Sequence, residues 1–312
     1  MTELTLLLIS LLATTVQVEV LSRLAPRSVE VFQGGRWITV RAGDPLPRQF
    51  RNPRLRLPGI LDRAYPGMLT LETRGGRLRL VNRVGEDEYV RGVLAAEAQT
   101  ASDPALQALA IAARSMIRFL RGRHRGVDLC DLTHCQAYAG LNSSPAIERA
   151  VRATAGRLLL FRDEPALAPY HSTCGGATVP PGKFFTRTAP YLAGVEDQGL
   201  CRRSPHFRWE VALTPAEVSR IADPEDPALA PGGVSRLSRE TFYRRAGRLL
   251  GWNVVKSADF TVELEGGRFL LRGRGLGHRV GLCQWGAEAL AALGKSAEEI
   301  LAFYFPGCTV GS

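Results

Sequence analysis

The chain has 312 residues, enough to bury a sizeable core in one large domain or in two smaller ones. Its hydrophobic fraction of 45% and charged fraction of 22% are typical of a soluble globular protein. The net charge is +10, but the arginines are scattered and no basic stripe with interleaved aromatics is present, which argues against nucleic-acid binding. No internal apolar run reaches about 18 residues, so no transmembrane helix is expected in the body of the chain.

The N-terminal segment permits three interpretations. Residues 2–15 contain an apolar run long enough for the core of a signal peptide and too short to span a membrane. The segment carries Glu3 and no basic residue, so a misassigned start or a first strand remain alternatives. From Val16 the alternation V-Q-V-E-V predicts a strand, and residues 16–84 are expected to form a β-rich layer that supports the rest of the molecule.

Two helices are predicted after this layer. The first is expected to begin near Asp87, whose side chain can cap it, and its apolar positions recur at helical spacing. Glu97 continues that apolar face. A carboxylate on the buried side of a helix is either paired with a cation or held for proton transfer, and both interpretations stay open.

The second helix is marked by Asp103 as its cap and Pro104 at its first helical position. Arg114 lies near the apolar face of this helix and is the obvious local partner for the Glu97 carboxylate.

A cluster of cysteine and histidine follows the second helix. His124, Cys130, His134 and Cys135 fall within twelve residues and could complete a tetrahedral Zn²⁺ site, although their spacing is not that of a standard zinc finger. A Cys130–Cys135 disulfide and two free thiols with bystander histidines are the alternatives. The six cysteines form an even number, which suits an oxidising compartment without establishing one.

Later motifs supply further candidates. Gln136 and Tyr138 offer a polar, stacking surface for sugar rings, or else a buried tyrosine with a satisfied hydroxyl. In His171-Ser-Thr-Cys-Gly-Gly176, two glycines allow the backbone to approach a ligand closely. Cys174 and Cys201 flank a short segment and could pair across it.

The C-terminal third holds a peripheral segment and a glycine-rich motif. Residues 205–265 contain two predicted helices separated by a Pro/Gly-rich linker. The run Gly273-Arg-Gly-Leu-Gly277-His278 has the wrong glycine spacing for a dinucleotide site, and no βαβ unit follows it. A last helix is predicted from Ser296 to Tyr304.

Six runs together resemble the SpoIID/LytB family of peptidoglycan-processing proteins, over roughly residue 16 to the C-terminus. In order they are YVRGVLAAEA, ALAIAARS, DLTHCQAYAG, YHSTCGGAT, GRGLGHRVGLCQWGA and ILAFYFPG. The family form of the fifth run is closer to GRGWGHGVGMCQWGA, so Leu276, Arg279 and Leu282 depart from it, and an aromatic sugar contact is missing.

This resemblance implies a mixed α+β fold: a β-rich N-terminal layer, a central helical region and a cleft formed with the Gly-rich C-terminal motif. It divides residues 16–312 into a β-rich part (16–84), a catalytic and metal-loop core (85–204), the peripheral segment (205–265) and the cleft motif (266–312). It also makes the HSTCGG loop a groove-lining loop.

The resemblance further implies a lytic transglycosylase of the cell envelope, outside the cytoplasm, with no organic cofactor. Glu97 occupies the position of the family's catalytic acid, and the substrate is the peptidoglycan glycan strand. A positive charge would assist attraction to this anionic polymer, although an ordinary solvated surface is the favoured explanation of the charge. The expected substrate-binding residues are Arg114, Gln136, Tyr138, Ser172, Thr173, His278 and Gln284.

Two other functions stay open. LytB-type relatives enhance a separate wall amidase, which makes a non-catalytic glycan-binding protein the main alternative. A metallohydrolase that uses the Cys/His cluster is disfavoured, because four protein ligands leave no coordination position for water.

Overall fold

The structure is a computed structural model that describes residues 15–312 except 142–143, 183, 186 and 223–236. The chain divides into two compact units, unit 1 (Met1–Leu167 with Val310–Ser312) and unit 2 (Ala168–Thr309). Residues 1–14 of the predicted signal segment and the whole Pro/Gly-rich linker (223–233) lie outside the described residues.

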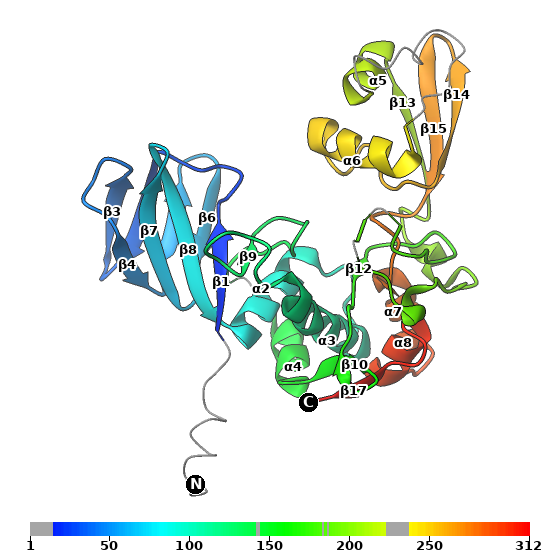
Figure 1. Ribbon diagram of the computed structural model, residues 1–312, viewed down its shortest axis with the longest axis horizontal. Helices are drawn as coiled ribbons and strands as arrows, with labels where there is room; N and C mark the ends of the chain where they lie inside the picture. Colours follow the sequence, from blue (N-terminus) through cyan, green and yellow to red (C-terminus); the bar gives the residue numbers. More distant parts are fainter. Residues whose placement is uncertain (1–14, 142–143, 183, 186, 223–236) are drawn as a thin grey trace, which may run out of the picture. The chain divides into compact units, whose positions relative to one another are not determined.

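Unit 1 opens with two antiparallel-rich sheets, visible as the blue and cyan arrows in Figure 1. The strands of the first sheet, in the order β4-β7-β8-β1-β9, are Arg48–Arg51, Met68–Arg74, Arg77–Gly85, Thr15–Val20 and Leu129–Cys130. Those of the second, in the order β3-β2-β5-β6, are Arg36–Arg41, Ser28–Gln33, Arg54–Leu57 and Leu61–Ala64. A small sheet of β11 (Glu164–Pro165), β10 (Leu158–Phe161) and β17 (Thr309–Gly311) is separate.

The alternation that predicted the first strand places its valines in the core. Val16, Val18 and Val20 of β1 are at most 1% exposed. Thr15 and Gln17, which alternate with these valines, are exposed. Side chains of a strand alternate between its two faces, so this pattern buries one face of β1. β1 pairs antiparallel with β8 and parallel with β9, which connects the first strand to the chain beyond the helices.

Three helices complete unit 1: α2 (Glu86–Glu97), α3 (Asp103–Leu120) and α4 (Pro145–Ala153). α3 is buried around most of its circumference, because small alanines at 108, 110, 112 and 113 let α2, α4 and β10 pack closely against it. The caps lie slightly earlier than predicted: Gly85, two residues before Asp87, caps α2, and Ser102, one residue before Asp103, caps α3. At α2 the side chain of Glu88 accepts the Gly85 N–H, which leaves Asp87 available for another contact.

Unit 2 contains one sheet with its own apolar core and a second, smaller motif. β13 (Arg208–Leu213), β15 (Arg268–Arg274) and β14 (Phe260–Glu265) form the sheet, and α5 (Pro215–Ile221) and α6 (Arg239–Leu250) pack on it around Trp209, Phe242 and Leu271. The smaller motif holds β12 (Tyr170–His171), β16 (Leu282–Cys283), α7 (Gln284–Ala292) and α8 (Ala297–Tyr304), with short turns η1 (Pro190–Leu192) and η2 (Leu200–Arg203).

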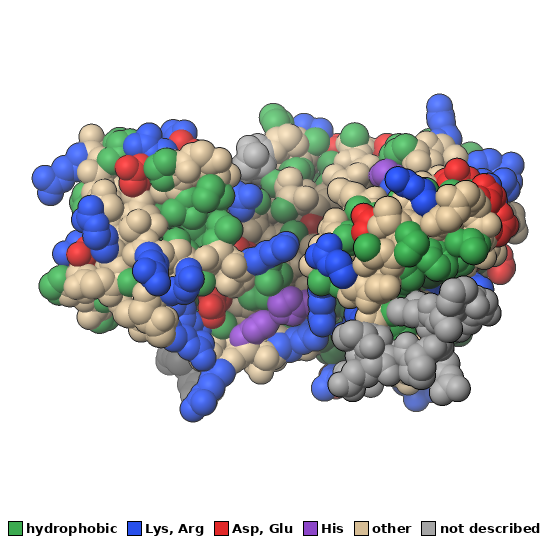
Figure 2. All heavy atoms as spheres, turned by 90° about the horizontal axis from the view of Figure 1, so that it is seen from above, with side chains coloured by type: hydrophobic (Ala, Val, Ile, Leu, Met, Phe, Trp, Pro, Cys, Tyr) green, Lys and Arg blue, Asp and Glu red, His purple; other side chains and the backbone are tan. Residues whose placement is uncertain are grey.

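The predicted fold class is confirmed: the protein is α+β with a β-rich N-terminal region. The last helix is capped by Ser296 and ends at Tyr304, as its sequence indicated. Among the described residues, no helix is both long and apolar enough to cross a membrane. Arginine and lysine side chains are dispersed over the face drawn in Figure 2, as the scattered arginines of the sequence led us to expect.

Gly92 provides a test of how closely α2 is packed. A Cβ atom there would lie 2.4 Å from Cε2 of Tyr138 and 2.6 Å from the carbonyl oxygen of Gly140. Alanine favours a helix interior by about 1 kcal/mol over glycine, but overpacking a tight site costs about 1–3 kcal/mol. We expect Gly92→Ala to lower the free energy of unfolding in chemical denaturation.

Gly43→Ala is the matched control, since a Cβ at that position meets nothing within 4 Å. Its unfolding free energy should stay within about 0.5 kcal/mol of wild type. Equal or greater stability of Gly92→Ala would show that the α2 contact is looser than described.

Candidate functional site

Glu97 is the last residue of α2, and its side chain is partly exposed. Its Oε1 accepts a short hydrogen bond from the backbone N–H of Ala137, which lies on the loop after the Cys/His cluster. The helix ends here because Ala98 adopts an extended conformation, with φ −64° and ψ 127°. The carboxyl group is therefore fixed to a loop that is 40 residues away in sequence.

Two buried side chains hold that loop on either side of Ala137. Gln136 donates from Nε2 to the carbonyl of Ala113 at 3.2 Å, and Tyr138 donates its hydroxyl to Oδ1 of Asn82 at 2.9 Å. Each is 2% exposed. Neither side chain has surface to offer a sugar ring, so their predicted substrate-binding role is wrong, and the alternative of a buried, satisfied tyrosine is correct. Their role is to fix the amide that positions Glu97.

The predicted pairing of Arg114 with Glu97 is also wrong. Arg114 is fully buried, and its Nη2 contacts Oδ1 of Asp87 at 2.7 Å while its Nε lies 3.7 Å from Oε1 of Glu86. Its Nη1 donates to the carbonyls of Thr154 at 2.8 Å and Arg157 at 3.3 Å.

These contacts engage the guanidinium at the opposite end of α2 from Glu97, because Asp87 lies in the first turn of the helix and not at its cap. A fully buried side chain with these partners is structural, so Arg114 is not a substrate ligand.

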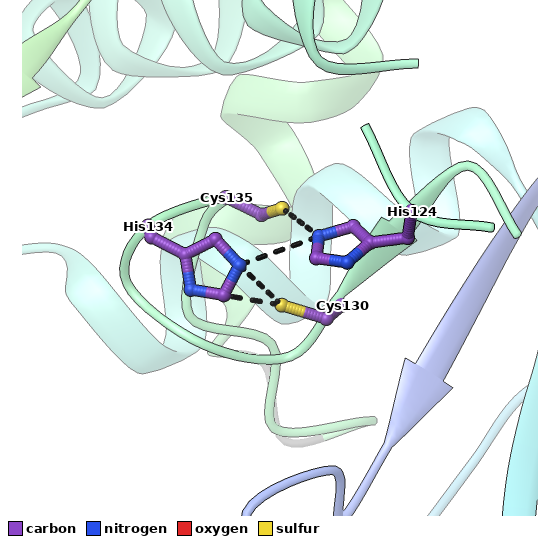
Figure 3. Close-up of side chains that lie close together, drawn as sticks. All are labelled: His124, Cys130, His134 and Cys135. Atoms are coloured by element: carbon purple, nitrogen blue, oxygen red, sulfur yellow. Dashed lines mark hydrogen bonds between the residues drawn. The ribbon is translucent and has the colours of Figure 1, made fainter. Parts of the chain in front are cut away.

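The four residues of the Cys/His cluster come together as the sequence predicted. Figure 3 shows their sulfur and nitrogen atoms pointing toward a common centre. Nε2 of His124 lies 3.1 Å from Sγ of Cys135, and Nε2 of His134 lies 3.3 Å from both Sγ of Cys130 and Nε2 of His124. Ligand atoms around a tetrahedral Zn²⁺ are separated by about 3.3–3.8 Å, given Zn–N and Zn–S bonds of about 2.0 and 2.3 Å. The donor set therefore fits zinc with small adjustments.

The two thiols of this cluster are free and differ in acidity. The hydrogen bond from the Cys130 thiol, together with the contact to His124, lowers the pKa of Cys135 to about 5. The same thiol–thiol hydrogen bond raises the pKa of Cys130. The lowered pKa of Cys135 favours its thiolate, the form that binds metal.

The candidates of unit 2 form a second group. Thr173 exchanges backbone hydrogen bonds with Leu276, and the Trp285 N–H donates to the carbonyl of Ser172 at 3.2 Å, next to Gln284. The HSTCGG loop is thus in contact with the Gly-rich motif. Gly175 needs to be glycine, because it has φ +75° and a Cβ there would lie 2.8 Å from Cβ of Arg274.

Most of these unit 2 side chains are engaged inside the protein. Thr173 is fully buried and contacts the Ser204 hydroxyl at 2.7 Å, whereas Ser172 is partly exposed. Nδ1 of His278 accepts the Val280 N–H at 3.0 Å, and desolvation lowers the pKa of His278 to about 4. His278 is therefore neutral at physiological pH. Gln284 is 3% exposed at the start of α7.

Unit 2 also holds a cavity of about 620 Å³ that the sequence did not reveal. Gly175 and Gly176 of the HSTCGG loop contribute to its wall, so this loop does line a hollow. Its charged lining consists of Arg202, Arg208, Arg274 and Arg279 with one acidic residue, Glu196. Such a lining favours an anionic ligand. These arginines form two pairs in the sequence, Arg202 with Arg208 and Arg274 with Arg279, and nothing in the sequence indicated that the two pairs meet.

Comparison with known proteins shows what the chain is similar to. Residues 74–161 match the family model of the stage II sporulation protein SpoIID, and this segment includes Glu97 and the whole Cys/His cluster. In this segment the chain is similar to the SpoIID family. Stage II sporulation protein D of Bacillus subtilis is 29% identical over 262 residues, covering 74% of this chain and 75% of that protein.

Two further relatives extend the SpoIID comparison. An uncharacterized protein of Brachyspira hyodysenteriae is 28% identical over 267 residues, which cover 79% of this chain and 72% of that protein. The amidase enhancer of Bacillus subtilis is 24% identical over 250 residues, covering 60% of this chain but only 36% of the enhancer.

The structural role of Arg114 predicts a stability effect. Arg114→Ala leaves the carboxylates of Glu86 and Asp87 and two backbone carbonyls without their buried donor. Asp87 is 42% exposed and Glu86 keeps its contact with Arg118, so the main cost comes from the backbone carbonyls that lose their donor. A buried polar group without a partner costs about 1–3 kcal/mol, and we expect a loss of about that size in the free energy of unfolding by chemical denaturation.

Arg118→Ala is the matched control. Arg118 also contacts Glu86, at 2.6 Å, but its side chain is 29% exposed, and partly solvated pairs contribute about 0–1 kcal/mol. An Arg114→Ala variant as stable as Arg118→Ala would contradict the buried-bridge interpretation.

Proposed function

We propose that this protein acts at the cell wall as a peptidoglycan lytic transglycosylase that cleaves the bond between N-acetylmuramic acid and N-acetylglucosamine. The observation that carries the proposal is Glu97, a partly exposed carboxyl group fixed by the Ala137 amide inside the segment that matches the SpoIID model. The names of the relatives, a sporulation protein and an amidase enhancer, support a role at the wall.

Glu97 would perform both proton transfers of the reaction. The Glu97 carboxyl group, oriented by the Ala137 N–H, would deliver a proton to the glycosidic oxygen. The resulting carboxylate would then accept the proton of the muramic 6-hydroxyl, which attacks the anomeric carbon of its own sugar. The products would be a free 4-hydroxyl on N-acetylglucosamine and a 1,6-anhydro muramic end.

A single carboxyl group is sufficient for this chemistry. Ordinary glycosidases use two carboxylates about 5–9 Å apart to manage nucleophile and leaving group. Here the nucleophile is part of the substrate, so proximity replaces the second carboxylate. Asp131 is not available as a second acid, because its carboxylate accepts the Leu21 N–H at 2.7 Å and the Ser22 hydroxyl at 2.5 Å.

His124, Cys130, His134 and Cys135 would hold a structural Zn²⁺. A four-ligand site has no open position, so the metal would supply rigidity and take no part in the reaction. Cys135 is two residues before Ala137, whose amide contacts Glu97. The metal would therefore fix the loop that orients the catalytic carboxyl group.

The residues of unit 2 would bind the glycan and its substituents. Ser172 has exposed surface, and the arginine-lined cavity beside the HSTCGG loop would attract carboxylates of the wall polymer. Thr173, His278 and Gln284 would support this surface from within, since their side chains are buried or engaged in hydrogen bonds. We place the protein in the cell envelope, outside the cytoplasm.

The alternative is a non-catalytic protein that binds glycan and enhances a separate wall amidase. The relationship to the amidase enhancer favours it, although that relationship covers only 36% of the enhancer. Incubation with purified glycan strands separates the functions: a transglycosylase yields anhydro sugar, a hydrolase yields a reducing end, and an enhancer alone yields no cleavage.

Glu97→Gln is the central test of the proposal. Glutamine keeps the oxygen that accepts the Ala137 N–H but cannot donate a proton to the leaving oxygen. General acid–base catalysis contributes about 10²–10⁴-fold, and because both steps are lost we expect at least the upper end of that range. The measurement is the rate of 1,6-anhydro muropeptide formation, followed by mass spectrometry.

Glu148→Gln is the matched control, since Glu148 is a partly exposed carboxylate of the same unit that pairs with Arg91 at 3.1 Å. It should keep wild-type activity. Normal glycan cleavage by a folded Glu97→Gln protein would end the enzymatic proposal, and absence of cleavage by wild type in the presence of denuded and peptide-bearing strands would favour the enhancer.

The zinc proposal has readouts independent of activity. We expect Cys130→Ser/Cys135→Ser to lose about one zinc per chain in elemental analysis, compared with Cys308→Ser, whose thiol lies outside the cluster. Chelator should lower the melting temperature of wild type before activity falls, because metal binding and local folding are linked. Unchanged zinc in the double variant, or thiols missing at Cys130 and Cys135 when the denatured protein is alkylated, would refute it.

A further inference from the structure

Three cysteines and one aspartate converge in the interior of unit 2. We call Cys174, Asp197, Cys201 and Cys283 the second cluster; one ligand atom from each lies within 4.8 Å of all the others. All four residues are 0% exposed. They come from four separate segments: the loop after β12, the turn before η2, η2 itself and β16. None of them takes part in the proposed reaction.

The distances within the second cluster are close to those of a tetrahedral metal site. Sγ of Cys174 lies 3.4 Å from Sγ of Cys201 and 2.7 Å from Oδ2 of Asp197. Around Zn²⁺ the corresponding separations are about 3.8 and 3.6 Å, from Zn–S bonds of about 2.3 Å and Zn–O bonds of about 2.1 Å. The cluster therefore needs a widening of about an ångström or less at these two contacts to accept the ion.

Backbone N–H groups donate hydrogen bonds to the ligand atoms of the second cluster. The Cys174 N–H donates to Sγ of Cys283 at 3.3 Å, and the Gly199 N–H donates to Oδ1 of Asp197 at 2.9 Å. The Gly175 amide likewise donates to Cys201, and the Gly286 amide to Cys283. Such hydrogen bonds orient ligands and stabilise their anionic form, as they do around protein-bound metals.

The buried hydroxyl of Tyr304 lies close to the second cluster and favours an anionic acceptor there. Tyr304 is 1% exposed, and its hydroxyl has no hydrogen-bond partner among the described residues. A Cβ at Gly286 would lie 1.8 Å from that hydroxyl oxygen and 3.4 Å from Oδ2 of Asp197, so glycine at 286 brings the two groups near each other. A buried polar group without a partner is costly, and an anionic metal–carboxylate centre would give it an acceptor.

We propose that the second cluster binds a structural Zn²⁺ through three thiolates and the Asp197 carboxylate. Soft thiolates select thiophilic ions, and four protein ligands complete the coordination of zinc without leaving a catalytic position. A Cys174–Cys201 disulfide accounts for the cluster less well. It would use two of the three sulfurs and leave the Cys283 thiol and the Asp197 carboxyl group together in the interior.

The metal would hold together the surface that is proposed to bind glycan. Cys174 follows Thr173 directly and Cys283 precedes Gln284, so the ion would lock the HSTCGG loop to the start of α7. Gly175 and Gly199 adjoin the ligands and line the arginine-rich cavity. The assignment of the ion itself does not depend on any catalytic role of Glu97.

The test combines a metal count with a thiol count on the full-length chain. Protein is purified without added metal, and zinc per chain is measured by elemental analysis and by native mass spectrometry. Cysteines are alkylated under denaturing conditions with chelator and without reductant, and modified sites are mapped. The samples are wild type, Cys130→Ser/Cys135→Ser, Cys201→Ser and the control Cys308→Ser.

We expect Cys130→Ser/Cys135→Ser to keep about one zinc per chain and to show Cys174, Cys201, Cys283 and Cys308 all as free thiols. Cys201→Ser should lose about one zinc relative to Cys308→Ser. If either cluster variant does not fold, the wild-type protein still provides the test. About two zinc ions per chain together with six free thiols would support a zinc ion in each cluster.

Two outcomes would overturn the proposal. A metal-free Cys130→Ser/Cys135→Ser protein in which Cys174 and Cys201 resist alkylation would mean a disulfide. A metal-free variant with every thiol free would mean a reduced cluster without an ion. Neither outcome bears on Glu97, so the failure of this proposal is distinguishable from failure of the transglycosylase.

Discussion

The buried guanidinium of Arg114 is the contact on which unit 1 depends. It joins the first turn of α2, through Asp87 and Glu86, to the backbone carbonyls at the end of α4 and before β10. An uncompensated charge in this position would destabilise the fold by several kcal/mol, so the three helices hold one arrangement. This arrangement also fixes the C-terminal end of α2, where Glu97 lies.

The loop that meets Glu97 is fixed by a different kind of interaction. Gln136 and Tyr138 anchor the backbone on both sides of Ala137, and the Cys/His cluster closes the loop just before them. Preorganised groups of this kind hold a side chain in one geometry without using its own charge. Gln136 and Tyr138, which the sequence suggested as sugar contacts, therefore act on Glu97 through the backbone of Ala137.

The features that could be predicted from the sequence are those that depend on residues close together in the chain. Alternation identified β1, Pro104 placed the cap of α3 within one residue, and close spacing indicated that His124 and Cys135 share one centre. Long-range partners were not predictable, because nothing local distinguishes Asp87 from Glu97 as the partner of Arg114. The second cluster was missed for the same reason: Asp197 and Cys283 have no motif in common with Cys174.

The wide spacing of the second cluster has a consequence for the order of folding. Cys174 and Cys201 are 27 residues apart, whereas Cys174 and Cys283 are separated by 109. Short loops close earlier than long ones, so a two-thiol intermediate forms before the third sulfur arrives with β16. In that intermediate an oxidant would join Cys174 to Cys201 in a disulfide, whereas the proposed ion would bind both thiolates. The redox conditions during folding, rather than those around the folded protein, would then decide which form of unit 2 is made.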